Sequence, residues 1–92
     1  MPEINVEWTA DALDDLEKLD PPIQKRIVRK VTWFSQYFSN QIPEPLSGEF
    51  RGTYKLRIGD WRVIYQLEEN IMVIRALGHR NNIYKTSSTR PS

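Results

Sequence analysis

Positively charged side chains converge on one face of a predicted β-hairpin. Gly59-Asp60 separates two alternating segments, and glycine at the first position of a two-residue loop is typical of a type II′ turn. With that turn, Arg57 lies directly opposite Arg62, and Lys55 lies one pair further along the same face. Like charges directly opposite one another destabilise a sheet. We therefore expect this face to bind an anion, and phosphate is the favoured candidate.

A histidine, an arginine and a tyrosine are predicted to join this cluster from the end of the chain. The strand expected at 71–78 runs antiparallel to the one before it, so its end returns beside Arg62 and places His79 and Arg80 there, with Tyr84 close behind. Arginine binds phosphate through two N–H groups at once, and histidine titrates near neutral pH. The tyrosine hydroxyl could move a proton, or its ring could stack on a base.

These residue types favour RNA cleavage without a metal ion. Such a reaction uses the 2′-hydroxyl of the substrate as nucleophile and needs a proton acceptor, a proton donor and cations around the phosphate. His79 is the only histidine, and no cluster of His, Asp and Glu has metal-ligand spacing, so we expect no metal and no cofactor. The sequence also lacks a glycine-rich phosphate loop and a serine or cysteine nucleophile with its base.

The elements that position these residues are predicted from periodicity. Residues 3–8 alternate like a half-buried strand, and Thr9 can cap a helix with apolar positions Leu13, Leu16 and Leu19. Asp20-Pro21-Pro22 is expected to end that helix and begin the next. The second helix carries one apolar face. That face comprises Ile23, Ile27, Val31, Phe34 and Phe38.

Three strands are expected to follow a connecting loop at 40–52, at about 53–58, 61–67 and 71–78. The last is nearly continuously apolar, as expected of a central strand. The order β-α-α-β-β-β predicts an α+β domain with a helical hairpin on one face of a small sheet. That face pairs Tyr54 with Tyr65, Leu56 with Val63 and Ile58 with Trp61. The cationic face is expected to be open to solvent.

Composition sets the broad class of the chain. Its 92 residues suit one domain, expected at 1–85, with a mobile tail at 86–92. There is no cysteine, no apolar run of membrane-spanning length and no signal peptide, so a cytoplasmic protein is expected. Residues 1–50 carry five basic and nine acidic side chains, whereas residues 51–92 carry eight and three. This segregation predicts a surface that faces a polyanion.

The chain resembles the RelE side of the RelE/ParE toxin superfamily over roughly residues 3–85. The similar segments are the YKLR sequence at 54–57, GDWRVIY at 59–65, GHR at 78–80 and IY at 83–84. The resemblance implies a RelE-like fold and a toxin of a type II toxin–antitoxin module. Such toxins cleave translated mRNA on the ribosome and are restrained by a cognate antitoxin.

The family's site residues correspond to positions of this sequence one by one. The resemblance implies that Lys55 and Arg62, with Arg57 beside them, stabilise the phosphate. It implies that Tyr84 abstracts the 2′-hydroxyl proton and that Arg80 acts near the leaving oxygen. The best-studied members of the family carry a second lysine where this chain has Thr53, so the full strength of catalysis is left open. His79 could compensate as an acid or a base.

Simpler interpretations remain open for each of these residues. The three hairpin cations could be a solvated sheet face, His79 a surface residue at a strand end, and Tyr84 a packing residue. Arg80 could be a structural partner of Asp60. Four cations of the second helix could be an ordinary exposed face or an RNA contact; they are Lys25, Arg26, Arg29 and Lys30. Trp33 and Tyr37 lie off the apolar stripe and could contact an antitoxin.

Three functions are therefore compared. The first is a ribosome-dependent endoribonuclease toxin, the second a ParE-like toxin that binds DNA gyrase without cleaving RNA, and the third an RNA-binding regulatory module without toxicity. The full set of cations favours the first.

Overall fold

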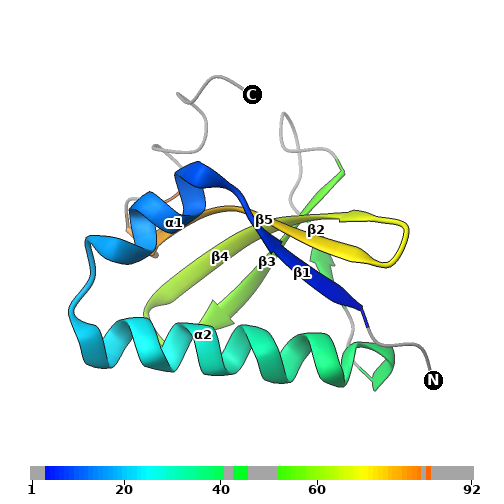
Figure 1. The fold of residues 1–92 in the computed structure, drawn as a ribbon, viewed down its shortest axis with the longest axis horizontal. Helices are drawn as coiled ribbons and strands as arrows, with labels where there is room; N and C mark the ends of the chain where they lie inside the picture. Colours follow the sequence, from blue (N-terminus) through cyan, green and yellow to red (C-terminus); the bar gives the residue numbers. More distant parts are fainter. Residues whose placement is uncertain (1–3, 41–42, 46–51, 82, 84–92) are drawn as a thin grey trace.

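The structure, a computed structural model, describes residues 4–40, 43–45, 52–81 and 83. Its elements are as follows. They are β1 (Asn5–Trp8), α1 (Ala10–Glu17), α2 (Pro21–Gln36), the 3₁₀ turn η1 (Phe38–Asn40), β2 (Glu44–Pro45), β3 (Thr53–Ile58), β4 (Trp61–Glu68) and β5 (Ile71–His79). The predicted α+β order is confirmed (Figure 1). The predicted tail at 86–92 lies outside the described residues.

The described strands form one sheet in the order β1-β5-β4-β3-β2. β5 is central, parallel to β1 and antiparallel to β4, which explains why its sequence is almost continuously apolar. α2 runs along one face of the sheet, and α1 precedes it beside β5 (Figure 1). Within the described part of the chain, no helix is both long and apolar enough to cross a membrane.

The hairpin register is the one predicted from the sequence. Arg57 pairs with Arg62, and on the other face Ile58 pairs with Trp61 and Tyr54 with Tyr65. Gly59 has a φ of 61°, whereas Glu69 is the only non-glycine among the described residues with a positive φ. A positive φ at the first loop position alone is the pattern of a type II′ turn.

The core lies between α2 and the apolar face of the sheet. The stripe of α2 is confirmed, because Ile27, Val31 and Phe34 are buried there against strand residues. The ring of Phe34 meets that of Tyr65 edge-on at a centroid distance of 5.9 Å, and Tyr54 stacks on Tyr65 at 5.7 Å. This aromatic contact fixes α2 over β3 and β4, on the face opposite the one that carries the cations.

One predicted core position of α1 is wrong. Leu13 was expected inside but is 45% exposed, whereas Ala12 is fully buried. Ala12 packs closely because the small side chain lets α1 approach the sheet. Leu16 and Leu19 do pack against the core, at partly buried positions.

α1 is held to β5 by polar contacts as well. Thr9 caps the helix by accepting from the backbone N–H of Ala12 at 3.2 Å, and its hydroxyl donates to the carbonyl of Ile74 at 2.8 Å. Further along, the Asp15 carboxylate accepts from the backbone N–H of Leu77 at 3.1 Å. Since β1 pairs with β5 only as far as Ile74, α1 satisfies edge groups of β5 that β1 does not reach.

Two further expectations need correction. The loop expected at 40–52 contains a short edge strand, β2, which pairs Glu44 with Lys55 and Pro45 with Tyr54. The cationic face is only partly open, because Ile64 and Ala76 are buried beneath Ile83 on that side of the sheet. Ile83 lies against Gly78, where an added Cβ would meet Ile83 Cδ1 at 3.3 Å.

Candidate functional site

Two arginines lie directly opposite one another at the turn end of the β3–β4 hairpin. Arg57 and Arg62 are paired in the register, and the side chain of Arg57 is 59% exposed. Lys55 lies two residues away on the same face, opposite Ile64, and is less exposed. The expected group of three cations is therefore present, although only the arginine pair is directly opposed.

A carboxylate that the sequence interpretation missed lies beside this group. Glu44 Oε2 is 3.3 Å from Arg57 Nη2 and 4.0 Å from Lys55 Nζ. The contact depends on β2, which places Glu44 directly opposite Lys55. The sequence carries little signal for this contact, because the two residues of β2 are too few to show the alternation of a strand. The cationic face thus contains a partial internal counter-ion.

Arg62 is oriented by the hairpin turn. Its Nη1 donates to the carbonyl of Gly59 at 2.8 Å and to its own neighbour's carbonyl, that of Trp61, at 2.9 Å. One end of the guanidinium is therefore fixed against the backbone. Restricting an arginine in this way lowers the entropy lost when its other N–H groups bind a phosphate.

His79 lies at the end of β5 on the opposite face of the sheet from Arg62. It pairs with Trp61, and the two rings meet edge-on at a centroid distance of 5.5 Å. The residue directly opposite Arg62 is Gly78. The backbone N–H of Asn81 donates to His79 Nδ1 at 3.3 Å, which leaves Nε2 to carry the proton in a neutral ring. The expected position of His79 beside Arg62 on the cationic face is therefore wrong, since the structure places it on the Trp61 face.

Arg80 is anchored to the hairpin turn. Its backbone N–H donates to the carbonyl of Asp60 at 2.8 Å, and its Nε lies 3.8 Å from Asp60 Oδ1. The structural partnership with Asp60 is confirmed, and it keeps Arg80 at the same end of the sheet as Arg62. Tyr84, the expected proton acceptor, lies outside the described residues.

A tyrosine hydroxyl of β4 is buried on the side of the sheet that packs against α2. Tyr65 is fully buried, and its hydroxyl has no hydrogen-bond partner within the described structure. Burial is the main cause that raises the pKa of Tyr65 well above its usual value. The nearby Tyr54 and Glu44 raise this pKa further. The described residues contain no group of three or more His, Cys, Asp and Glu side chains able to hold a metal ion.

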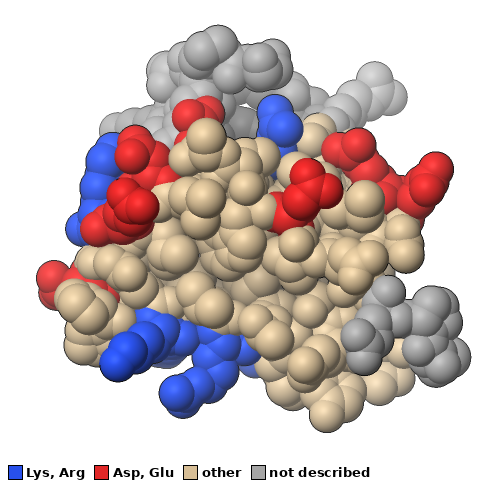
Figure 2. Space-filling model, viewed as in Figure 1, with Lys and Arg blue, Asp and Glu red and all other residues tan. Residues whose placement is uncertain are grey.

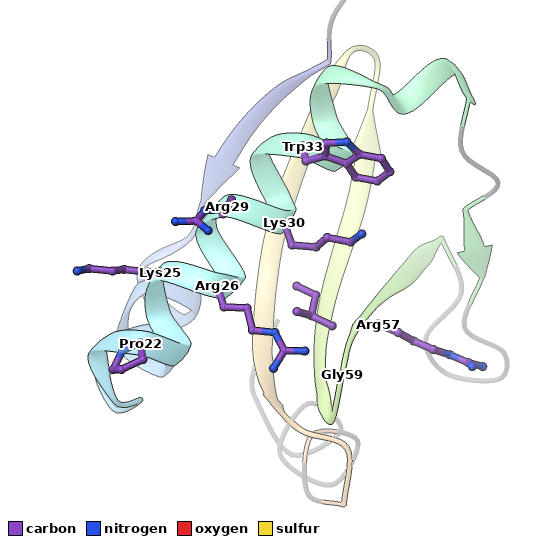
Figure 3. A pocket seen from close by; sticks show the side chains of 9 residues that line it. Pro22, Lys25, Arg26, Arg29, Lys30, Trp33, Arg57 and Gly59 are labelled. Atoms are coloured by element: carbon purple, nitrogen blue, oxygen red, sulfur yellow. The ribbon is translucent and has the colours of Figure 1, made fainter.

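A second cationic surface lies along α2. Figure 2 shows basic side chains gathered over this helix, while the acidic ones lie mainly in the upper half of that view. A groove of about 730 Å³ separates α2 from β3. It is lined by Pro22, Lys25, Arg26, Arg29, Lys30, Trp33, Arg57, Ile58 and Gly59 (Figure 3). Arg57 therefore borders both cationic surfaces.

Comparison with known proteins identifies the class. A family model described as the ParE toxin of the type II toxin–antitoxin system parDE matches residues 6–84. The chain therefore belongs to this toxin family, within the RelE/ParE toxin superfamily of type II toxin–antitoxin systems.

Individual relatives agree with this assignment. Toxin RelG of Mycobacterium tuberculosis is 32% identical over 82 residues, which span 87% of this chain and 94% of RelG. The toxin–antitoxin complex RelBE2 of the same organism contains a chain 29% identical, with a TM-score of 0.69, covering 87% of this chain and 94% of that one. A free mutant of E. coli RelE has the same fold at 20% identity, with a TM-score of 0.72 over 94% and 93% of the two chains.

Proposed function

We propose that the protein is a toxin that cleaves translated mRNA on the ribosome, in the cytoplasm, and thereby arrests translation. The observation that carries this proposal is the direct opposition of Arg57 and Arg62, with Lys55 beside them, on a half-covered sheet face. Three cations at such close quarters are unfavourable alone and become favourable around a phosphate that gains negative charge. The similarity to toxin RelG and the RelE-like fold support the same reaction class.

In the proposed reaction the 2′-hydroxyl of the RNA attacks the adjacent phosphorus, and the 5′-oxygen of the next nucleotide leaves. Lys55, Arg57 and Arg62 stabilise the phosphate oxygens, and Arg80 acts near the leaving oxygen. Tyr84 is the proposed proton acceptor. His79 is the alternative proton-transfer group, and it would have to reach the reacting atoms around the end of β5, because it lies on the opposite face of the sheet from Arg62. The step needs no metal ion.

The proposed regulatory partner is a cognate antitoxin. The related chain of RelBE2 comes from a toxin–antitoxin complex. A partner helix with acidic and apolar residues would match the exposed cations and the half-exposed rings of Trp33 and Tyr37. Charge reversal at Arg57 or Arg62 should therefore weaken the complex. If the partner leaves the cationic face open while abolishing cleavage, inhibition works by blocking access to the ribosome.

The test is cleavage of mRNA on purified ribosomes, followed by analysis of the product ends. The proposed reaction leaves a 2′,3′-cyclic phosphate and a 5′-hydroxyl. Products with a 5′-phosphate, or a divalent-ion requirement of the toxin itself, would contradict it. Because ribosomes need magnesium, the ribosomes are kept at constant magnesium, and only the toxin is freed of divalent ions by a chelator before mixing.

A second candidate function is favoured by the matching family model, which is that of ParE toxins. In this alternative the protein binds DNA gyrase and cleaves no RNA. Expression in a bacterial host separates the candidates, because gyrase inhibition induces the DNA-damage response whereas the proposed nuclease cuts mRNA inside reading frames. Unimpaired growth would indicate an RNA-binding module without toxicity.

A further inference from the structure

The groove between α2 and β3 is built mainly from one stripe of the helix. Arg26, Lys30 and Trp33 follow the i, i+4, i+7 spacing and extend from α2 toward the strand, as Figure 3 shows. Lys25 and Arg29 extend from the other side of the helix in the same view. The helix side of the groove therefore combines two cations and an aromatic ring.

The two cations on the helix side of the groove, Arg26 and Lys30, have no ion-pair partner among the described residues. Lys55 and Arg57 differ in this respect, because both contact Glu44. Arg26 also lies close to the hairpin turn, since a Cβ added at Gly59 would come within 2.7 Å of Arg26 Nη2. Arg26 therefore lies close to the strand, and an anion that binds Arg26 and Lys30 displaces no internal carboxylate.

The aromatic wall lies next to the cations. Trp33 is 41% exposed, and Lys30 Nζ lies 4.2 Å from the centroid of its ring. The ammonium lies over the ring face, so a nucleotide would replace this contact: the base stacks on the indole and the ammonium turns to the phosphate. A volume of about 730 Å³ also lies within the ordinary range of small-molecule sites.

We propose that this groove is a nucleotide-binding site, in which Trp33 contacts the base and Arg26 and Lys30 bind the phosphates. Arg57 at the rim adds a further positive charge. The nucleotide could be a free nucleoside polyphosphate or one residue of an RNA strand, since both present the same chemistry. The site lies on the helix side of β3 and does not depend on the proposed cleavage reaction. Its test is therefore a binding measurement.

The first test separates base recognition from phosphate recognition. The purified full chain is titrated calorimetrically with ATP, tripolyphosphate and adenosine. ATP should bind about 5-fold to 100-fold more tightly than tripolyphosphate, the range that one stacked base provides. Trp33→Leu should abolish that preference while leaving the tripolyphosphate affinity unchanged. Equal binding of ATP and tripolyphosphate to the wild-type protein would overturn the assignment of the base.

The second test locates the phosphate site. Lys30→Gln should weaken both ATP and tripolyphosphate binding several-fold and reduce the dependence of affinity on salt. Lys18→Gln is the control, because Lys18 is an exposed lysine at the C-terminal end of α1 and does not line the groove. It should bind both ligands like the wild type. Equal losses in the two variants would mean unspecific attraction and would overturn the site.

The third test distinguishes the two sources of the nucleotide. A short 2′-O-methyl oligoribonucleotide, which the proposed reaction cannot cleave, is titrated alongside ATP. Binding of ATP that is sensitive to Trp33→Leu supports a free nucleotide, and binding of the oligonucleotide alone with the same sensitivity supports an RNA strand. Binding of neither ligand at millimolar concentration would overturn the proposal, whether or not the protein cleaves mRNA.

Discussion

The carboxylate of Glu44 lies 3.3 Å from the guanidinium of Arg57. This contact places a negative charge where the sequence pattern leaves only positive ones, and it explains how the hairpin tolerates two opposed arginines without a ligand. A phosphate that binds Lys55 and Arg57 must compete with Glu44 for the same N–H groups. The unliganded site is therefore stabilised by the group that the substrate has to replace.

Replacing Glu44 with glutamine should strengthen phosphate binding at the hairpin, because the variant keeps the side-chain size and removes the competing charge. The expected gain is several-fold in the affinity for a non-cleavable oligoribonucleotide at low salt. The loss in unfolding free energy should be only about 0.2–1 kcal/mol, since the ion pairs are exposed. Binding is measured by calorimetry and stability by urea denaturation.

Glu68→Gln is the control for this prediction, because it removes one exposed carboxylate at the far end of β4. It should change neither quantity appreciably. If Glu44→Gln instead binds RNA normally and loses cleavage, Glu44 takes part in the reaction and the counter-ion interpretation is wrong.

Replacing Arg62 with alanine should slow cleavage about 10²–10³-fold, the cost of removing one donor that stabilises transition-state charge, or about 2.7–4 kcal/mol. Arg62→Lys keeps the charge but not the two-pronged geometry, so its activity should be intermediate. Single-turnover cleavage on programmed ribosomes measures both. Because Arg62 also binds the turn carbonyls, a thermal melt must show that each variant is folded. Wild-type activity in Arg62→Ala would exclude the residue from the site.

The hairpin could be predicted from sequence because its register depends on local features. A glycine suited to a type II′ turn, with alternation over 54–58 and 61–63 on its two sides, favours one pairing, and a shift by one residue would expose Leu56 and Val63. The stripe of α2 was predictable for a similar reason, since five apolar residues at helical spacing define one face.

The positions that sequence did not reveal depend on contacts between distant segments. Glu44 reaches the cations only because β2 pairs with β3, and two residues are too few to show alternation. Ala12 is buried instead of Leu13 because α1 docks on β5 through Thr9 and Asp15. The groove along α2 likewise exists only once the helix lies against β3.

The roles of Tyr84 and His79 should be separable by conservative variants. Tyr84→Phe keeps a ring for stacking but cannot transfer a proton, so cleavage should fall strongly while RNA binding is retained. His79→Gln keeps a hydrogen-bond donor, so the cleavage rate should fall less than in Tyr84→Phe. The effect of this variant should show in the slope of the cleavage rate against pH. If Tyr84→Phe cleaves at the wild-type rate and His79→Gln is inactive, the assignment of the proton acceptor is reversed. The measurement is the cleavage rate on programmed ribosomes between about pH 6 and about pH 9.

Replacing Gly59 with alanine should destabilise the fold by about 1–3 kcal/mol, because its positive φ is unfavourable for a residue with a side chain. The new Cβ would also crowd Arg26 Nη2 at 2.7 Å. Gly52→Ala is the control, since Gly52 has a φ of 81° but open space around it. Gly59→Ala should lower the unfolding free energy more than Gly52→Ala does. This difference should disappear in the Arg26→Ala background, as measured by urea denaturation. A difference that remains without the Arg26 side chain would show that crowding by Arg26 is not its cause.

Replacing Tyr65 with phenylalanine should remove an alkaline loss of stability. Burial raises the pKa of Tyr65, so the folded protein keeps this proton above about pH 10, where the unfolded chain releases it. The unfolded state then binds fewer protons, and the unfolding free energy falls as pH rises, by at most ~1.4 kcal/mol per pH unit. Tyr65→Phe lacks this contribution and should decline less between pH 8 and pH 11 in urea denaturation.

At pH 8 the same variant should be at least as stable as the wild type, because the hydroxyl it removes is buried without a partner in the described structure. Tyr37→Phe removes the hydroxyl of a half-exposed ring and should leave the loss caused by Tyr65 in place. A clear destabilisation of Tyr65→Phe at pH 8 would show that the hydroxyl does have a hydrogen-bond partner in solution. In that case the alkaline decline would report the rupture of that bond, and Tyr65 would be a polar anchor of β4 under the cationic face.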